Sequence, residues 1–441
     1  MTSQAKDQFR QLFHSTAWVG FLTFLVKVLA IGRDMAMAYR YGRSSDLEVF
    51  LVTCTMVQFL AYAIAGSIPS AFIPLYARLA SKPGASLGGF NRIILMQILC
   101  LCIIAIVFFG LYAPAWFRFQ GIPDGSVLHS AKTTGWLILL LPIMSVQYLL
   151  GAVLQAQYRL TAVSLAPAWS AFTIGAFLLM VPGRPASTLT GAFLLGGFLE
   201  TAWVTLVLRV HNRNFLSGPA PDAATVRQYW GQYLPIVFGA IFVNSNNFVD
   251  LLVASRLAPG SVAAISYANK VASGLTGVVA TALGAVALPL FSRMIANGEH
   301  ASIRKVAWKD CLWITAAGIP LALVLAYFSE PITRLVFHRG AFTLEDVKAI
   351  APIQAMYILQ IPFYFLSILL VRIISAFRKN HLLFGWTIAA SVLNISLDLV
   401  LAKLMGPIGI ALSTTLVFAI ACPVMGYWVW GLSRDLGKEL G

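Results

Sequence analysis

Long apolar stretches separated by short polar loops dominate the pattern of this 441-residue chain. A helix needs about 20 apolar residues to cross the hydrocarbon core of a bilayer, and each of these stretches is long enough to do so. Glycine and proline inside them are compatible with membrane helices, because neighbouring helices satisfy the backbone groups that they free. The pattern predicts an all-α polytopic membrane protein with about twelve transmembrane helices, at residues 15–40, 47–77, 92–116, 134–158, 161–182, 187–209, 230–257, 262–292, 307–328, 348–377, 382–403 and 407–432.

Composition agrees with a membrane protein. Hydrophobic residues make up 59% of the chain and charged residues 11%, and the mean hydropathy is +0.81, which excludes an ordinary soluble domain of this length. The polar start at residues 1–10 precedes an apolar segment that is too long for a signal peptide, so no cleavable signal peptide is expected. The five cysteines and six histidines show no metal-ligand spacing, and we interpret the cysteines as packing residues.

The distribution of Lys and Arg predicts the orientation in the membrane. Loops on the side of the amino terminus carry 17 of these residues, and loops on the opposite side carry 10. Because cytoplasmic loops are enriched in Lys and Arg, both termini are expected in the cytoplasm. The net charge of +15 fits this topology and contact with anionic lipid headgroups, so no nucleic-acid partner is expected.

The chain contains an internal repeat. Three pairs of landmarks keep nearly the same spacing: Asp34–Arg40 with Asp250–Arg256 at an offset of 216, Pro74–Arg78 with Pro289–Arg293 at 215, and Ala156 with Ala376 at 220. Six helices in each half, both halves beginning on the same side, predict two parallel repeats around a central cavity, related by an axis along the membrane normal. The predicted division is a first half at 1–213, a cytoplasmic linker at 214–229 and a second half at 230–441.

Charged residues inside or at the edge of the apolar segments predict a pathway for a charged solute. A charge at the centre of a membrane helix costs about 2.5–3.5 kcal/mol on insertion scales, so residues that keep one are functional candidates. The acids are Asp34, Glu48, Glu200, Asp250, Asp310 and Asp398, and the cations are Lys27, Arg33, Lys270 and Arg372. We interpret Asp34 and Arg372 as coupling or structural charges.

The motifs around several of these charges resemble those of the MurJ/MviN lipid II flippases, a family of the MOP exporter superfamily. In the first half, the similar segments are Lys27–Asp34, Tyr41–Gly42, Glu48–Phe50 and Ser70–Pro74. In the second half, they are Asp250, Ser266–Lys270, Gly284–Pro289, Phe337–Phe342 followed by Glu345 and Asp346, and Gly406–Thr415. The resemblance covers essentially the whole chain and keeps the order of the family's motifs. It implies a MATE/MOP-like fold and a transporter rather than an enzyme.

The resemblance also implies a substrate, a polyprenyl-pyrophosphate-linked saccharide that alternating access moves across the bacterial inner membrane. It places cations at Lys27, Arg33 and Lys270 and an acid at Glu48, which we expect to form the substrate site. The pyrophosphate must cross a region of low dielectric, where fixed cations facing a wet cavity would replace part of its hydration. Lysine binds phosphate as a point charge and lacks the bidentate fork of arginine. In the structural alternative, Lys27 and Arg33 only reach toward the nearer membrane interface.

Two departures from the family pattern leave the glycan unassigned. The second helix of the family carries an arginine pair near its middle, where this chain has Leu60-Ala61-Tyr62. Family members also have two further helices that help to form a groove for the lipid tail, whereas twelve are predicted here. The expected substrate is therefore a lipid II-like peptidoglycan precursor or the repeat unit of an exopolysaccharide or O-antigen, and the other expected partners are membrane lipids.

The acids of the second half predict an ion site that supplies the energy. Asn394 and Asp398 are four residues apart and share one face of a helix. With Asp250 and Thr414 they offer hard oxygen ligands, which suit a non-transition cation. The resemblance implies a sodium site at these four residues, with a backbone carbonyl near Ile410. A proton on the same carboxylates is the alternative, and no other cofactor is expected.

Other interpretations stay open from the sequence alone. A cation antiporter of small molecules would share the superfamily fold, but it would leave the cations at Lys27, Arg33 and Lys270 unexplained. A membrane glycosyltransferase or ligase would need a carboxylate or histidine on a large outer surface, and the longest predicted outer loop, at 329–348, has about twenty residues. For the acids, the alternative is an Asp398 that is protonated or paired with Lys403 or Arg372.

Overall fold

Helices form all the regular structure in the part of the chain that the computed structural model describes, residues 3–81, 86–119, 135–181 and 185–435. The first half contains α1 (Ser3–Tyr41), α2 (Ser45–Ile64), α3 (Ile68–Ala80), α4 (Leu87–Phe119), the 3₁₀ helix η1 (Gly135–Leu139), α6 (Leu140–Ala156), α7 (Leu160–Met180) and α8 (Ala186–His211). The second contains α9 (Ala223–Ala254), α10 (Ser261–Ala296), α11 (His300–Tyr327), α12 (Ser329–Phe337), α13 (Leu344–Leu359), α14 (Ile361–Ala376), α15 (Asn380–Met405) and α16 (Pro407–Asp435). The predicted all-α class is confirmed.

Ten segments of the described chain are long and apolar enough to cross a membrane. Each of them overlaps one of the segments predicted from the sequence. The other two predicted segments, 15–40 and 262–292, lie within α1 and α10, which are helices of 39 and 36 residues. The chain is therefore a multi-pass membrane protein, as the hydropathy pattern predicts.

Two of the predicted segments are each divided into two helices. Segment 47–77 forms α2 and α3, and segment 348–377 forms α13 and α14. Pro69 lies in the first turn of α3 and Pro362 in the first turn of α14. Proline fits the first turn of a helix because it has no N–H to leave unsatisfied, and it disfavours continuation of a helix from the preceding residues. The two prolines therefore account for both breaks.

The predicted outer loop at 329–348 contains helical structure instead of open loop. It holds α12 and the first residues of α13. Thr343 caps α13 and forms a capping box with Asp346, in which each side chain binds the backbone N–H of the other residue. Asp346 also lies 3.6 Å from Nη1 of Arg43, so the segment is held by an ion pair as well.

The chain divides into two compact units. The first comprises Met1–Tyr41 and Asp46–Phe248, and the second comprises Gly42–Ser45 and Val249–Gly441. Most of α9 therefore belongs to the first unit, and its last turns, with Asp250, belong to the second. The limits predicted from the sequence, 1–213, 214–229 and 230–441, stay a prediction about the repeat.

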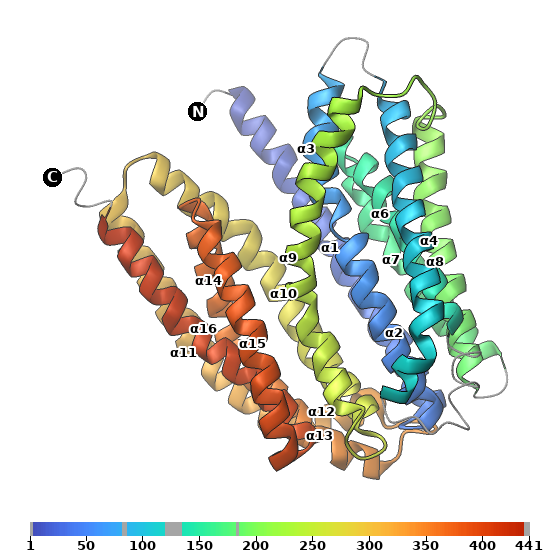
Figure 1. Cartoon of the computed structure of the whole chain (residues 1–441). Coiled ribbons are helices and arrows are strands. Elements are labelled where there is room, and N and C mark those ends of the chain that lie inside the picture. The colour runs from blue at the N-terminus through green and yellow to red at the C-terminus, as the bar shows by residue number, and fades with distance from the viewer. Residues whose placement is uncertain (1–2, 82–85, 120–134, 182–184, 436–441) are drawn as a thin grey trace. The chain divides into compact units, whose positions relative to one another are not determined.

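The two units repeat the same pattern of helix packing. In the first unit α3 and α4 pack against α6, and α6 and α7 pack against α8 (Figure 1). In the second unit α10 and α11 pack against α14, and α14 and α15 pack against α16. These helices occupy the second to sixth positions of each predicted half, in the same order, so the packing supports an internal repeat.

The repeat extends to the backbone of one turn. Tyr158 and Arg378 have φ angles of 59° and 58°, and they are the two non-glycine residues of the described chain in the left-handed region. Both turns show the Schellman arrangement, which satisfies the last carbonyls of a helix. The bonds are Tyr158 N–H to Gln155 O (2.9 Å), Arg159 N–H to Leu154 O (2.9 Å), Arg378 N–H to Ser375 O (2.9 Å) and Lys379 N–H to Ile374 O (3.2 Å). Their offset of 220 matches the spacing of Ala156 and Ala376.

Each unit has an apolar core of its own. In the first, the buried rings of Phe72 and Phe90 stack with their centres 5.2 Å apart and join α3 to α4. In the second, Phe291, Ile373 and Ile374 are 0% exposed and lie in a cluster that joins α10, α11, α14 and α16. Such close-packed cores hold the polar side chains of each unit in fixed positions.

Candidate functional site

Two cations of the predicted substrate site, Lys27 and Arg33, lie on α1, and both are partly exposed. Six residues correspond to about 9 Å along a helix and about 120° around it. Arg33 donates from Nε at 3.0 Å and from Nη2 at 2.9 Å to one carboxylate oxygen of Asp34. Asp34 is only 7% exposed, so this ion pair compensates a carboxylate that burial would otherwise penalise. The guanidinium also lies 6.0 Å from the centre of the Phe193 ring.

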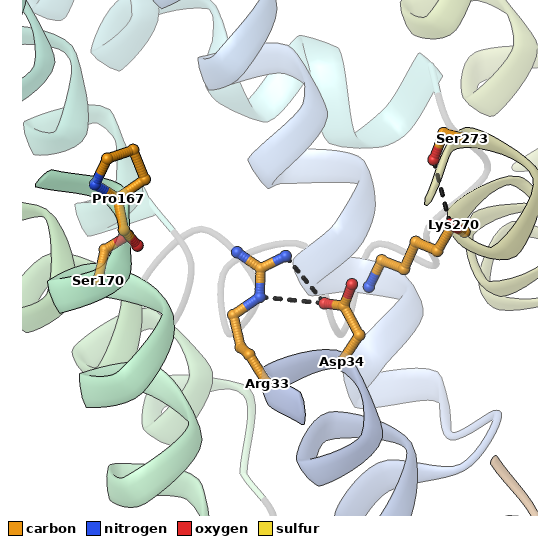
Figure 2. A network of polar contacts seen from close by, with 6 residues as sticks. All are labelled: Arg33, Asp34, Pro167, Ser170, Lys270 and Ser273. Carbon is orange, nitrogen blue, oxygen red and sulfur yellow. Dashed lines mark hydrogen bonds and ion pairs between the residues drawn. The ribbon is translucent and has the colours of Figure 1, made fainter. Parts of the chain in front are cut away.

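Arg33 lies beside α7. A Cβ added to Gly175 would be 3.6 Å from the Cα of Arg33, so the glycine allows the two backbones to approach closely. Figure 2 shows Arg33 and Asp34 with Pro167 and Ser170 of α7, where the Ser170 hydroxyl donates to the Pro167 carbonyl at 3.2 Å. Helix α7 thus packs against α1 at Arg33.

Glu48, the predicted acid of the substrate site, lies in the first turn of α2. A carboxylate at this position interacts favourably with the positive end of the helix dipole. Arg33 lies eight residues before the end of α1, or about 12 Å along the helix. Glu48 is therefore closer to the start of α2 than Arg33 is to the end of α1.

The remaining predicted cations lie in the second unit. The Nζ atom of Lys270, on α10, is 5.3 Å from the centre of the Tyr267 ring. Its backbone carbonyl accepts a hydrogen bond from Ser273 at 3.2 Å (Figure 2). Arg372, on α14, lies against α10, because a Cβ at Gly284 would be 3.0 Å from Nη2 of Arg372. Gly284 and Lys270 are about 21 Å apart along α10, so Arg372 and Lys270 lie at different levels along this helix.

The four predicted ion ligands come together in the second unit. Nδ2 of Asn394 donates to Oδ1 of Asp250 at 2.9 Å and to Oδ2 of Asp398 at 2.8 Å. The Thr414 hydroxyl lies 3.5 Å from Oδ2 of Asp250. Asp250, Asn394 and Asp398 are 4%, 1% and 0% exposed. The structure thus gathers all four residues from α9, α15 and α16, and their role as an ion site stays a prediction.

Ser413 belongs to this group and was missed by the sequence reasoning. Its hydroxyl donates to Oδ1 of Asp398, and it lies 2.7 Å from the Ile410 carbonyl. The same carbonyl accepts from Thr414 at 3.4 Å. The only signal in the sequence was that Ser413 adjoins Thr414, and a serine inside a helix usually binds the carbonyl of a preceding turn instead.

The alternative ion pairing of Asp398 is wrong. Among the described residues, no ion pair joins Asp398 to Lys403 or Arg372, since Asp398 accepts hydrogen bonds from Asn394 and Ser413 instead. Lys403 is exposed near the end of α15, and Arg372 lies against α10.

The donor set suits a hard cation. Oxygen ligands come from two carboxylates, two hydroxyls and the Ile410 carbonyl, while the Asn394 amide donates its N–H groups to both carboxylates. Within the described residues, no three His, Cys, Asp or Glu side chains gather as a transition-metal site would need. Two buried carboxylates this close together are costly if both are charged.

The fold is that of the MOP-superfamily transporters. The chain resembles a solved lipid II flippase MurJ in an inward closed conformation, with a TM-score of 0.81 and 20% identity, over 95% of this chain and 89% of that one. It also resembles an inward-facing multidrug resistance transporter of the MATE family, with a TM-score of 0.75 and 13% identity, over 94% and 96% of the two chains. Identities this low show the fold alone.

Sequence comparison identifies the family. A family model described as lipid II flippase MurJ matches residues 37–439. The chain belongs to the MurJ lipid II flippase family, as its motifs predict. A probable lipid II flippase MurJ of Thermotoga maritima is 28% identical over 404 residues, which cover 90% of this chain and 81% of that protein. A lipid II flippase MurJ of Burkholderia cenocepacia is 24% identical over 422 residues, covering 91% and 80%.

Proposed function

We propose that this protein is a flippase that moves a polyprenyl-pyrophosphate-linked saccharide across the bacterial inner membrane. Membership of the MurJ family over residues 37–439 is the observation that carries this proposal. The relatives from Thermotoga maritima and Burkholderia cenocepacia are named as lipid II flippases and cover most of the chain. Lipid II, a peptidoglycan precursor, is therefore the substrate that we favour over exopolysaccharide or O-antigen repeat units.

The pyrophosphate of the carrier is the group that needs the cations. From the family's motifs we assign it to Lys27, Arg33 and Lys270, with Glu48 as the acid of the site. Lysine contributes a compact charge with three rotatable donors, which suits an anion whose orientation changes during transport. Asp34 offsets the charge of Arg33, because the two side chains form an ion pair.

Sodium or proton coupling at Asp250 and Asp398 would supply the energy. Asp250, Asn394, Asp398, Ser413, Thr414 and the Ile410 carbonyl would hold the cation, which supplies positive charge between the two carboxylates when it is bound. Asn394 would then have to present Oδ1 instead of its N–H groups. These residues lie on three helices, so neutralising the two acids changes how closely α9, α15 and α16 can pack.

Coupling requires that the cation bind one conformation better than the other, because only differential affinity shifts an equilibrium. In the proposed cycle of alternating access, the occupied ion site favours one conformation of the transporter, and the empty site favours the other. Both termini would lie in the cytoplasm, since the loops on that side carry the excess of Lys and Arg. The small-molecule antiporter alternative rests on likeness of fold alone.

A flipping assay in proteoliposomes tests the function. The full chain is reconstituted with fluorescent lipid II in one set of vesicles and fluorescent phosphatidylglycerol in another, each with and without an imposed sodium or proton gradient. We expect gradient-dependent movement of lipid II and no movement of the phospholipid. Failure to move lipid II would leave the other lipid-linked repeat units as substrates, and failure with all pyrophosphate-linked saccharides would refute the proposal.

A further inference from the structure

The first unit contains a cavity of about 380 Å³ between α1, α2, α6, α7 and α8, the polar cavity, whose lining combines polar side chains with apolar ones such as Ile143 and Met144. Its polar lining consists chiefly of Arg33, Gln58, Tyr62, Gln147, Tyr148 and Glu200. All six side chains keep some accessible surface. Gln58, Gln147 and Glu200 lie near the middle of helices that are long and apolar enough to span the membrane. The cavity therefore lies at membrane depth, where polar groups are costly unless they have a partner.

Two of these side chains are already ordered by a direct bond. Nε2 of Gln147, on α6, donates to Oε1 of Glu200, on α8, at 2.7 Å. Phe193, also on α8, gives the cavity an aromatic wall and lies 6.0 Å from the Arg33 guanidinium. The close packing of α6 on α8 fixes the positions of Gln147 and Glu200. Both side chains line the cavity.

The charges of the lining do not suit a pyrophosphate. Asp34 offsets the charge of Arg33 through the ion pair at 2.9 Å, and Glu200 adds a carboxylate to the same wall. The cavity therefore offers no surplus of positive charge, which a multiply charged anion would need. A lipid tail is also disfavoured, because it would cover the amide of Gln58 and the free hydrogen-bonding positions of the Gln147–Glu200 pair with hydrocarbon.

A neutral group that carries several hydroxyls fits this lining. Each glutamine amide both donates and accepts, as a sugar hydroxyl does, and the tyrosines combine an apolar ring with a polar tip. The volume falls in the range of small-molecule pockets, about 300–1,000 Å³, and is near its lower end. The larger cavity of the second unit, about 1,000 Å³, is lined instead by apolar residues such as Leu366 and Leu370 together with Trp308 and Trp430.

We propose that the polar cavity of the first unit binds a sugar ring of the lipid-linked saccharide, with Gln147 and Glu200 as specificity-determining residues. This inference rests on the proposed flippase function and deepens it. Two sets of residues then recognise the substrate. The lysines bind the charged pyrophosphate, and the cavity distinguishes a glycosylated carrier from a bare one.

The test is a binding experiment on the purified full chain with two probes. One is undecaprenyl pyrophosphate, and the other is the same carrier with a peptide-free disaccharide, so that only the sugar differs. We expect the wild-type chain to bind the glycosylated carrier about tenfold more tightly, as a few hydrogen bonds would give. Gln147→Leu and Glu200→Gln should reduce this preference to about twofold or less, while binding of the bare carrier stays the same.

Two matched variants keep the result interpretable. Gln97→Leu removes a membrane glutamine of the same unit that binds Trp230 at 2.8 Å and lies outside the cavity, so it should keep the tenfold preference. Tyr148→Phe removes one cavity hydroxyl with little change of shape, and it should lower the preference even if Gln147→Leu prevents folding. Unchanged preference in Gln147→Leu, Glu200→Gln and Tyr148→Phe would overturn this inference alone. A wild-type chain that binds neither carrier would overturn the proposed function.

Discussion

Asp250 and Asp398 share one hydrogen-bond donor, the side-chain amide of Asn394, at 2.9 and 2.8 Å. The two carboxylates come from α9 and α15, which are far apart in the sequence. Because both are buried, this amide and the hydroxyls of Ser413 and Thr414, all neutral donors, compensate them poorly if both are charged. We therefore expect a cation or a proton to bind at this pair of carboxylates.

Asp398→Asn should weaken the dependence of flipping on the ion gradient more than it weakens folding. The asparagine keeps the shape and can still accept from Ser413, but it removes one of the two charges that attract a cation. The measurement is the flipping rate as a function of sodium concentration and of pH. Asp310→Asn, which changes another membrane acid of the second unit, is the matched control. Wild-type dependence on both ions in Asp398→Asn would rule out the coupling role.

Ser413→Ala should destabilise the protein by about 1–2 kcal/mol, because it removes a donor from a buried carboxylate. Thermal unfolding of the purified protein, with and without sodium, is the measurement. Ser396→Ala provides the control, since Ser396 is exposed on α15 and its hydroxyl donates to the Val392 carbonyl of its own helix. Equal effects of the two substitutions would argue against a special role of Ser413.

Lys270→Ala should slow flipping by roughly 10- to 150-fold, the loss expected for one hydrogen bond to a charged group. The protein should still insert and fold, since Lys270 is only partly buried. Lys270→Arg should keep most of the rate, because it preserves the charge and the contact with the Tyr267 ring. Lys309→Ala, at an exposed position of α11, is the control. Normal rates in both Lys27→Ala and Lys270→Ala would show that the cations do not hold the substrate.

Gly42→Ala should destabilise the protein by about 1–3 kcal/mol. Gly42 has a φ of 53°, and a Cβ there would lie 2.5 Å from the carbonyl oxygen of Ala341. Both the backbone conformation and the space exclude a side chain. Gly110→Ala is the matched control, since a Cβ at Gly110 meets nothing within 4 Å. Thermal unfolding distinguishes the two, and similar midpoints would contradict the structure of this turn.

Tyr158→Gly should stabilise the protein by up to about 1 kcal/mol, because glycine adopts the left-handed conformation without steric cost. Tyr158 is 91% exposed, so few contacts are lost. Arg378→Gly should shift the unfolding midpoint in the same direction, since its turn has the same hydrogen bonds. A lower unfolding midpoint for both variants would show that the contacts of the side chains stabilise these turns more than the backbone conformation destabilises them.

The sequence predicted the helical class, the membrane segments and the family, because each depends on patterns that the chain carries locally. Hydropathy marks a membrane helix by itself, and the spacing of Asp34 and Asp250 marks a repeat. The breaks before Pro69 and Pro362 were missed, because proline is tolerated inside membrane helices as well as at their starts. The pattern therefore could not show which prolines end a helix.

The ion ligands could be predicted only in part for a different reason. Asn394 and Asp398 lie four residues apart on one helix, so geometry alone places them together. The family resemblance implied that Asp250 lies near these two residues. The contact of Ser413 with Asp398 depends on how α16 is rotated relative to α15. The hydrogen bond between Gln147 and Glu200 could not be predicted either, because the two residues are 53 positions apart and meet only through the packing of two helices. Glu200 alone could be marked as unusual, because a membrane carboxylate is costly.

The turns at Tyr158 and Arg378 also bear on the history of the chain. An aromatic residue and a basic residue occupy a backbone position that glycine would fill more easily, yet the hydrogen bonds around them are the same. If the two halves arose by duplication of one ancestral half, the geometry of this turn has outlasted the identity of the residue that adopts it. Backbone dihedral angles would then record the common origin of the halves at positions where the amino-acid letters no longer do.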